Sequence, residues 1–173
     1  MSEATPLHMQ ECGFCRILAG KAEASFQFRD ERVAAFMDIK PVNPGHLLVI
    51  PVRHAVYLSD LDPADGARML EVAQNLAAAL RESGRTGGLK CKGVNFFLAD
   101  GEQAGQEVPH VHLHVIPRFR GDGFSLKLPP GYGRRAERSE LDRIAAAIKA
   151  GLAPPWIADC RLGALVRGTS GQT

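Results

Sequence analysis

The chain has 173 residues, of which 45% are hydrophobic and 23% charged, with a formal net charge of +2 at pH 7. This profile is typical of one globular domain, and the charge is too small to indicate nucleic acid or a membrane as a partner. No apolar run has the length of a membrane-spanning helix, and the first residues, MSEATPLHMQEC, lack the apolar stretch of a signal peptide. We therefore expect a cytoplasmic protein whose four cysteines are reduced thiols or metal ligands.

Short strands are predicted in the first third of the chain. The segment SFQFRDERVAAFMDI (25–39) indicates two strands around a polar turn at 29–32. After the Pro/Gly-rich crossover KPVNPGHLL, the aliphatic run HLLVIPV (46–52) predicts a buried strand.

A helix is predicted next. Asp62 is a favourable N-cap, Pro63 suits the first helical position, and Gly84 lies near the expected end. The apolar residues between them keep a helical spacing.

The remaining elements follow a similar logic. GVNFFLA (93–99) and HVHLHVIP (110–117) predict strands, and the polar, Gly-containing segment 100–107 predicts a loop between them. A last helix is expected from Ser139, with Asp142 completing a capping-box pattern.

These elements predict an α+β fold with a mainly antiparallel sheet and two main helices. We expect a domain over 1–150, with its core motifs in 12–118 and its C-terminal helix at 139–150. The tail 151–173 shows no periodicity and is expected to be partly disordered.

Three histidines, His110, His112 and His114, alternate with aliphatic residues in HVHLHVIPR. In a strand they share one face at a spacing of about 7 Å, so we do not expect the rings to bond one another directly. A zinc ion has its nitrogen ligands at about 2 Å, so at most one or two of the three could bind the same metal. A half-exposed strand with a polar wet face is the alternative to a ligand or metal site.

Cys12 and Cys15 form a C-x-x-C pair, which supplies half of a tetrahedral zinc site. His54, after the buried strand, and His110, at the start of the histidine strand, are the candidates for the other two ligands. Such a site is closed and structural, because no position is open for water. A pair of reduced, half-buried cysteines is the alternative. Cys91 and Cys160 stand alone and receive no role.

The sequence resembles the histidine triad (HIT) superfamily, specifically its Hint-like bacterial branch with an N-terminal C-x-x-C zinc site. CGFCRI, GKAEASFQFRDERVAAFMDIKPVNPGHLLVIPVRH and GVNFFLADGEQAGQEVPHVHLHVIPR follow that branch in order and spacing over 12–118. The resemblance implies a HIT-like fold with a five-stranded sheet, a homodimer, and a purine nucleotide conjugate as substrate.

The resemblance also implies roles for single residues. His112 is the nucleophile that attacks the α-phosphorus and forms a nucleotidyl-histidine intermediate, and a backbone carbonyl near His110 fixes its tautomer. His114 contacts a phosphate oxygen. The positions that match the nucleotide-binding residues are Asp38, Ile39, His46, Asn95, Gly105 and Gln106. The implied zinc ligands are Cys12, Cys15, His54 and His110.

One position departs from the family. Glu107 stands where many relatives carry a serine or threonine that serves the leaving group. We expect a hydrolase of adenosine phosphoramidate-like conjugates with no cofactor in catalysis. A Fhit-like dinucleoside polyphosphate hydrolase, and a nucleotide- or partner-binding protein with negligible turnover, are the alternatives.

Overall fold

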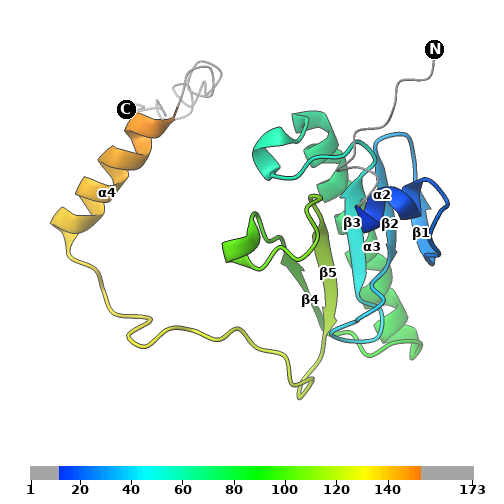
Figure 1. Ribbon diagram of the computed structural model, residues 1–173. Coiled ribbons are helices and arrows are strands. Elements are labelled where there is room, and N and C mark those ends of the chain that lie inside the picture. The colour runs from blue at the N-terminus through cyan, green and yellow to red at the C-terminus, as the bar shows by residue number, and fades with distance from the viewer. Residues whose placement is uncertain (1–11, 153–173) are drawn as a thin grey trace, which may run out of the picture. The chain divides into compact units, whose positions relative to one another are not determined.

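Five strands form one antiparallel sheet in the order β1-β2-β3-β5-β4 (Figure 1). The computed structural model describes residues 12–152. The chain forms two units, and the boundary between them along the chain lies between Ser125 and Leu126. The whole sheet belongs to the first unit. Its strands are β1 (Phe26–Arg29), β2 (Val33–Met37), β3 (Leu47–Pro51), β4 (Gly93–Phe97) and β5 (Leu113–Arg118).

Helices cover both faces of the sheet, so β2 and β3 are buried on both sides (Figure 1). Side chains alternate between the faces of a strand. In β2, Val33 and Ala35 therefore pack in the cluster that contains α3 (Pro63–Thr86), and Ala34 and Phe36 pack in the cluster that contains α2 (Gly13–Leu18). This double burial explains the continuous apolar runs that predicted these strands.

The predicted start of α3 is confirmed, and Gly84 lies near its end, as expected. Asp62 caps the helix by accepting a hydrogen bond from the Ala64 N–H at 2.8 Å. The helix continues beyond Gly84 to Thr86 and ends at Gly87, whose φ of 85° is left-handed. Gly84 also serves close packing, because a Cβ there would collide with the Cys91 carbonyl oxygen.

The histidine strand begins later than predicted. Its regular pairing starts at Leu113, so His110 and His112 precede β5. The Val111 N–H donates to the Ala55 carbonyl at 2.8 Å, which joins this segment to the loop after β3. The strand predicted at 93–99 is shorter than expected and ends at Phe97.

The second unit contains α4 (Arg138–Gly151). The predicted capping box is wrong, because the N-cap is Glu137 and no side chain caps the helix. Asp142 pairs instead with Arg138 one turn earlier, at 2.9 Å. The apolar stripe of α4 is exposed, with Ile148 at 63%.

Residues 153–173, which make up most of the predicted tail and include Cys160, lie outside the described residues. The predicted boundary near residue 150 therefore stays a prediction. Among residues 12–152, no helix is long and apolar enough to cross a membrane.

Candidate active site and metal centre

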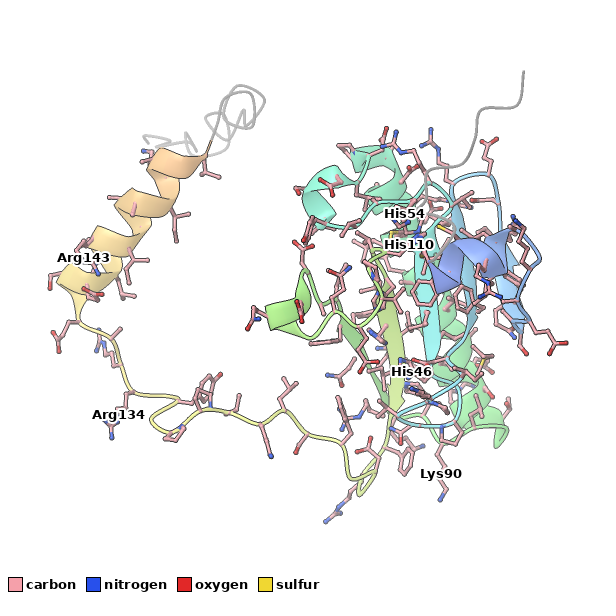
Figure 2. All side chains as sticks on the ribbon, in the orientation of Figure 1. His46, His54, Lys90, His110, Arg134 and Arg143 are labelled. Carbon is pink, nitrogen blue, oxygen red and sulfur yellow. The ribbon has the colours of Figure 1, made fainter. Side chains whose placement is uncertain are left out.

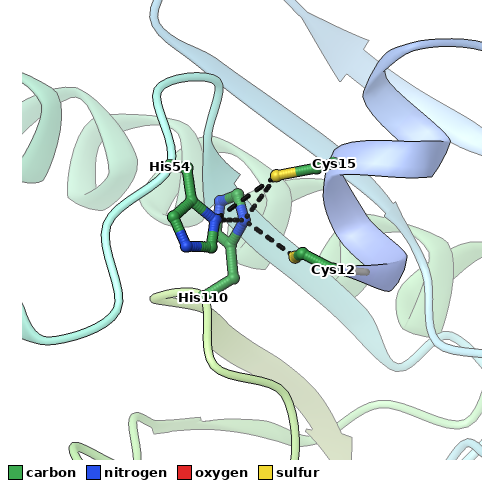
Figure 3. Close-up of side chains that lie close together, drawn as sticks. All are labelled: Cys12, Cys15, His54 and His110. Carbon is green, nitrogen blue, oxygen red and sulfur yellow. Dashed lines mark hydrogen bonds between the residues drawn. The ribbon is translucent and has the colours of Figure 1, made fainter. Parts of the chain in front are cut away.

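Two cysteines and two histidines from three segments converge beside the sheet. Cys12 and Cys15 lie at the start of α2, His54 follows β3, and His110 precedes β5 (Figure 3). The Nδ1 atom of His110 lies 3.5 Å from Cys12 Sγ and 3.6 Å from Cys15 Sγ. The Nδ1 atom of His54 lies 3.3 Å from both Cys15 Sγ and His110 Nδ1.

These separations match the edges of a zinc tetrahedron. Zn–N distances of about 2.0–2.1 Å and Zn–S distances of about 2.3 Å place neighbouring ligand atoms about 3.3 Å (N–N) and about 3.6 Å (S–N) apart. The second ring nitrogen of His110 donates to the Pro51 carbonyl at 2.9 Å, which leaves the Nδ1 lone pair for a metal. The four residues that the sequence predicted as ligands therefore lie in one cluster that fits zinc.

Burial shifts the pKa values of two side chains in this cluster. It lowers the pKa of His110 to about 4, so the ring is neutral at pH 7, as a metal ligand must be. Burial and the neighbouring Cys12 raise the pKa of the Cys15 thiol to about 12. A divalent cation in this place would have to displace thiol protons, and zinc supplies that driving force in sites of this composition.

His112 lies next to this cluster, and the backbone of His110 orients its ring. Its Nδ1 atom lies 2.7 Å from the His110 carbonyl oxygen, which is the acceptor that the resemblance to the HIT superfamily implied. Phe14, in α2, packs its ring edge-on against both imidazoles, with centroids 5.8 Å from His110 and 5.3 Å from His112. One turn of α2 therefore contacts both the Cys/His cluster and the predicted nucleophile.

A second polar cluster surrounds His114 and includes His46, which lies lower in Figure 2 than His54 and His110. His46 Nε2 lies 2.9 Å from His114 Nδ1, and Asp38 Oδ2 lies 3.4 Å from His46 Nδ1. Burial lowers the pKa of His114 to about 4 and lowers the pKa of His46 as well. The rings of His112 and His114 contact each other with centroids 4.9 Å apart, without a direct hydrogen bond.

The loop before the triad forms the wall of an open pocket of about 570 Å³. Gly105 has a φ of 91°, a conformation that favours glycine. The Gln106 amide holds the loop together, since its oxygen accepts from the Gly101 N–H at 2.7 Å and its nitrogen donates to the Val56 carbonyl at 2.8 Å. The pocket lining is Val56, Tyr57, Glu102, Gly105, Gln106, Glu107 and Pro109.

The other predicted nucleotide-binding residues lie at the surface. Ile39 is 93% exposed directly after Asp38. Asn95 lies on β4 and accepts a hydrogen bond from Arg118 at 3.0 Å. Its face of β4 also carries Phe97, which pairs with His114 in the sheet.

Sequence reasoning missed several contributors. Phe14 lies inside the C-x-x-C segment, but an aromatic residue there carries no signal of its contact with His112. Asp122 binds Arg118 through both carboxylate oxygens, at 2.6 and 2.9 Å, and accepts from Asn43 at 3.1 Å. These contacts fix the end of β5. Cys91 is buried and donates to the Gly93 carbonyl, which is a structural role.

Comparison with known proteins agrees with this geometry. The model of the HIT domain matches residues 19–121. An uncharacterized HIT-like protein of Borreliella burgdorferi is 40% identical over 119 residues, 69% of this chain and 84% of its own. The asymmetrical bis(5'-nucleosyl)-tetraphosphatase of Schizosaccharomyces pombe is 36% identical over 95 residues, 55% of this chain and half of its own.

Solved structures show the same fold. A HIT family protein from Bacillus anthracis superposes with a TM-score of 0.72 at 33% identity, covering 83% of this chain and 98% of its own. A zinc-bound histidine triad family protein from Mycobacterium smegmatis has a TM-score of 0.62 at 37% identity, covering 83% and 99%. With its five-stranded sheet, its triad and its matching domain model, this chain belongs to the HIT family.

Proposed function

We propose that this protein hydrolyses nucleoside monophosphate conjugates, such as adenosine phosphoramidates, with His112 as the nucleophile. The observation that carries the proposal is the 2.7 Å contact from His112 Nδ1 to the His110 carbonyl oxygen. A carbonyl can only accept, so Nδ1 holds the proton and Nε2 keeps its lone pair for attack. Neutral imidazole is a competent nucleophile near pH 7.

The reaction has two displacements at one phosphorus atom. His112 Nε2 attacks the α-phosphorus and a P–N bond forms, while the bond to the leaving group breaks and that group takes the electron pair and a proton from solvent. Water then attacks the same phosphorus, and the nucleoside monophosphate and His112 are released. His114 donates to a phosphate oxygen during both steps, where negative charge develops.

The pocket wall favours an amine over a polyphosphate as leaving group. Glu102 and Glu107 both line the open pocket beside Gly105 and Gln106. Two carboxylates repel a leaving group that carries several negative charges, and they do not repel a neutral or cationic amine.

The similarity to the tetraphosphatase of S. pombe supports a second candidate, the hydrolysis of dinucleoside polyphosphates. In that case Glu107 has to turn away from the polyphosphate chain. Turnover of the two substrate classes distinguishes these candidates.

The proposal includes a structural zinc and a homodimer that works in the cytoplasm. The four-atom cluster supports the zinc, as does the zinc-bound relative of M. smegmatis. Asp38 and the exposed Ile39 would hold the ribose and base of a purine nucleotide.

The test compares kcat/KM for adenosine phosphoramidate and diadenosine tetraphosphate in the wild type and in His112→Ala. We expect the phosphoramidate to be the better substrate, and we expect His112→Ala to lose turnover of both while it keeps its fold and zinc. Quenching with alkaline denaturant, with the substrate labelled on its adenosine, should trap label on the wild-type chain only.

Two outcomes would contradict the proposal. Equally poor turnover by wild type and His112→Ala, with nucleotide still bound, would indicate a binding protein. A preference for the tetraphosphate would establish the second candidate. Glu107→Ser is the matched variant for the leaving group, and it should raise tetraphosphate turnover relative to phosphoramidate turnover.

A further inference from the structure

The His46 side chain is buried, and both of its ring nitrogens have partners within the protein. It is 2% exposed. The backbone N–H of Val42 donates to His46 Nδ1 at 3.2 Å, and His46 Nε2 lies 2.9 Å from His114 Nδ1. A ring held in this way has no nitrogen left for a phosphate oxygen. Its contribution to the site therefore passes through His114.

The direction of these hydrogen bonds follows from the Val42 contact. A backbone N–H can only donate, so His46 Nδ1 is an acceptor. The Asp38 carboxylate is the competing partner of this nitrogen, but at 3.4 Å it lies beyond the usual range of an N–H···O hydrogen bond. Burial lowers the pKa of His46, so the ring is neutral at pH 7 and its single proton lies on Nε2.

The same logic fixes the proton of His114. Because His46 Nε2–H donates, His114 Nδ1 accepts. The pKa of His114 is lowered to about 4, so this ring is also neutral and carries its proton on Nε2. His112 has the opposite arrangement, with its proton on Nδ1 against the His110 carbonyl. Two imidazoles with centroids 4.9 Å apart therefore hold opposite tautomers.

We propose that His46 is a positioning residue that sets the tautomer of His114, so that His114 presents a fixed N–H beside the lone pair of His112. The chain of donors runs from the Val42 N–H through His46 to His114 and ends at the Nε2–H that faces the nucleotide. This rests on the proposed function only for the identity of the ligand. The tautomers themselves are a property of the free protein.

Fixed tautomers divide the work between neighbouring rings. His114 with Nε2–H cannot act as a nucleophile through that nitrogen, and it cannot accept a proton from a nearby water. It can only donate to a phosphate oxygen. His112 has its lone pair on Nε2, so that nitrogen can attack but cannot donate a hydrogen bond. A single proton moved from one nitrogen of His114 to the other would place a lone pair against the phosphate.

The carboxylate of Asp38 explains why the donor from His46 is needed. Asp38 Oδ2 lies 3.9 Å from His114 Nδ1. If His46 did not donate to that nitrogen, a small movement would let Nδ1 take the proton and donate to the carboxylate. Part of the protein would then carry the inverted tautomer of His114.

The three side chains of Asp38, His46 and His114 are also close enough to hold a metal ion. The hydrogen-bond chain and a metal exclude each other, because the metal would replace the proton between the two rings. The donor from Val42 on one side of His46 favours the hydrogen-bond chain.

The test reads the tautomers directly by long-range ¹H–¹⁵N spectra of the zinc-loaded protein labelled at histidine, without nucleotide, at pH 7. We expect Nε2–H for His46 and His114 and Nδ1–H for His112. In His46→Leu the His114 signals should shift to a mixture of tautomers. His46→Gln is the matched control, because its amide N–H can still donate to His114 and should retain Nε2–H.

Binding of adenosine monophosphate gives the second readout. We expect His46→Leu to weaken it about tenfold, the equivalent of one hydrogen bond to a charged group. His46→Gln should stay within about threefold of the wild type on the same scale.

Three outcomes would overturn the proposal. These are an Nδ1–H tautomer or an imidazolium at His114 in the wild type, an unchanged His114 in His46→Leu, or binding of a second zinc equivalent that removes the proton between His46 and His114. The wild-type spectrum needs no variant to fold. Failure of the proposed function would show differently, as correct tautomers without turnover.

Discussion

Phe14 packs against both the Cys/His cluster and the predicted nucleophile, and the loss of stability on its removal can be calculated. The ring is 9% exposed and packs edge-on against Phe36, His110 and His112, with centroids 5.3 to 5.8 Å away. In Phe14→Ala, the lost transfer of the ring from water costs about 2 kcal/mol. The unfilled space and the lost edge-to-face contacts add about 1–2 kcal/mol. Because the short helix α2 can relax into part of that space, we expect a total near the lower end, about 3 kcal/mol.

The assay is urea unfolding of the zinc-loaded protein, with thermal unfolding in parallel. A loss of about 3 kcal/mol lowers Tm by about 6–12 °C for a chain of this size. Phe14→Leu is the matched control and should lose only about 1 kcal/mol, because it keeps apolar volume and loses only the ring contacts. Zinc content must stay equal in all three proteins. A loss below about 1 kcal/mol in Phe14→Ala would refute the packing role assigned to this ring.

Three further predictions follow from other parts of the structure. Cys12→Ser should lower the zinc content measured by mass spectrometry well below that of the wild type, and chelation should lower the Tm of the wild type alone. Gly84→Ala should lower the free energy of unfolding in urea by about 1–3 kcal/mol, because its Cβ would collide with the Cys91 carbonyl oxygen; a stabilised variant would contradict this. Asp122 should stabilise the fold above about pH 4, since Arg118 holds the pKa of that carboxyl well below its usual range. That stability is lost as the pH falls, so the stability difference between wild type and Asp122→Asn in urea should shrink below about pH 4 and stay constant above it.

Local chemistry made much of the fold predictable. Asp62 and Pro63 mark a helix start by themselves, and the apolar runs of β2 and β3 reflect burial on both faces. The approximate end of α3 was predicted, but its exact last residue was not, since a glycine can mark either helix termination or close packing, and here Gly87 ends the helix while Gly84 packs closely. Only the folded structure brings the Cys91 carbonyl against it.

The site was predictable where the residue type carries the chemistry. The C-x-x-C pair offers half of a metal site, and although His54 and His110 are far from it in sequence, the cluster of four shows that they meet. The start of β5 was not predictable, because alternation reports which face a side chain takes and not where the backbone finds its partner. The Val111 N–H bonds to Ala55 outside the sheet, which lets His110 turn toward the cysteines.

The four candidate zinc ligands are far apart in the sequence, and this separation bears on the order of folding. His54 lies 39 residues from Cys15, and His110 lies 98 residues from Cys12. An unfolded chain offers a metal only the two neighbouring thiols, because closing the longer loops costs entropy that nothing yet repays. The four side chains can come together only after β3 has paired with β5 in the sheet. A zinc ion bound there would be captured late in folding, and it would slow unfolding more than it changes the folding rate.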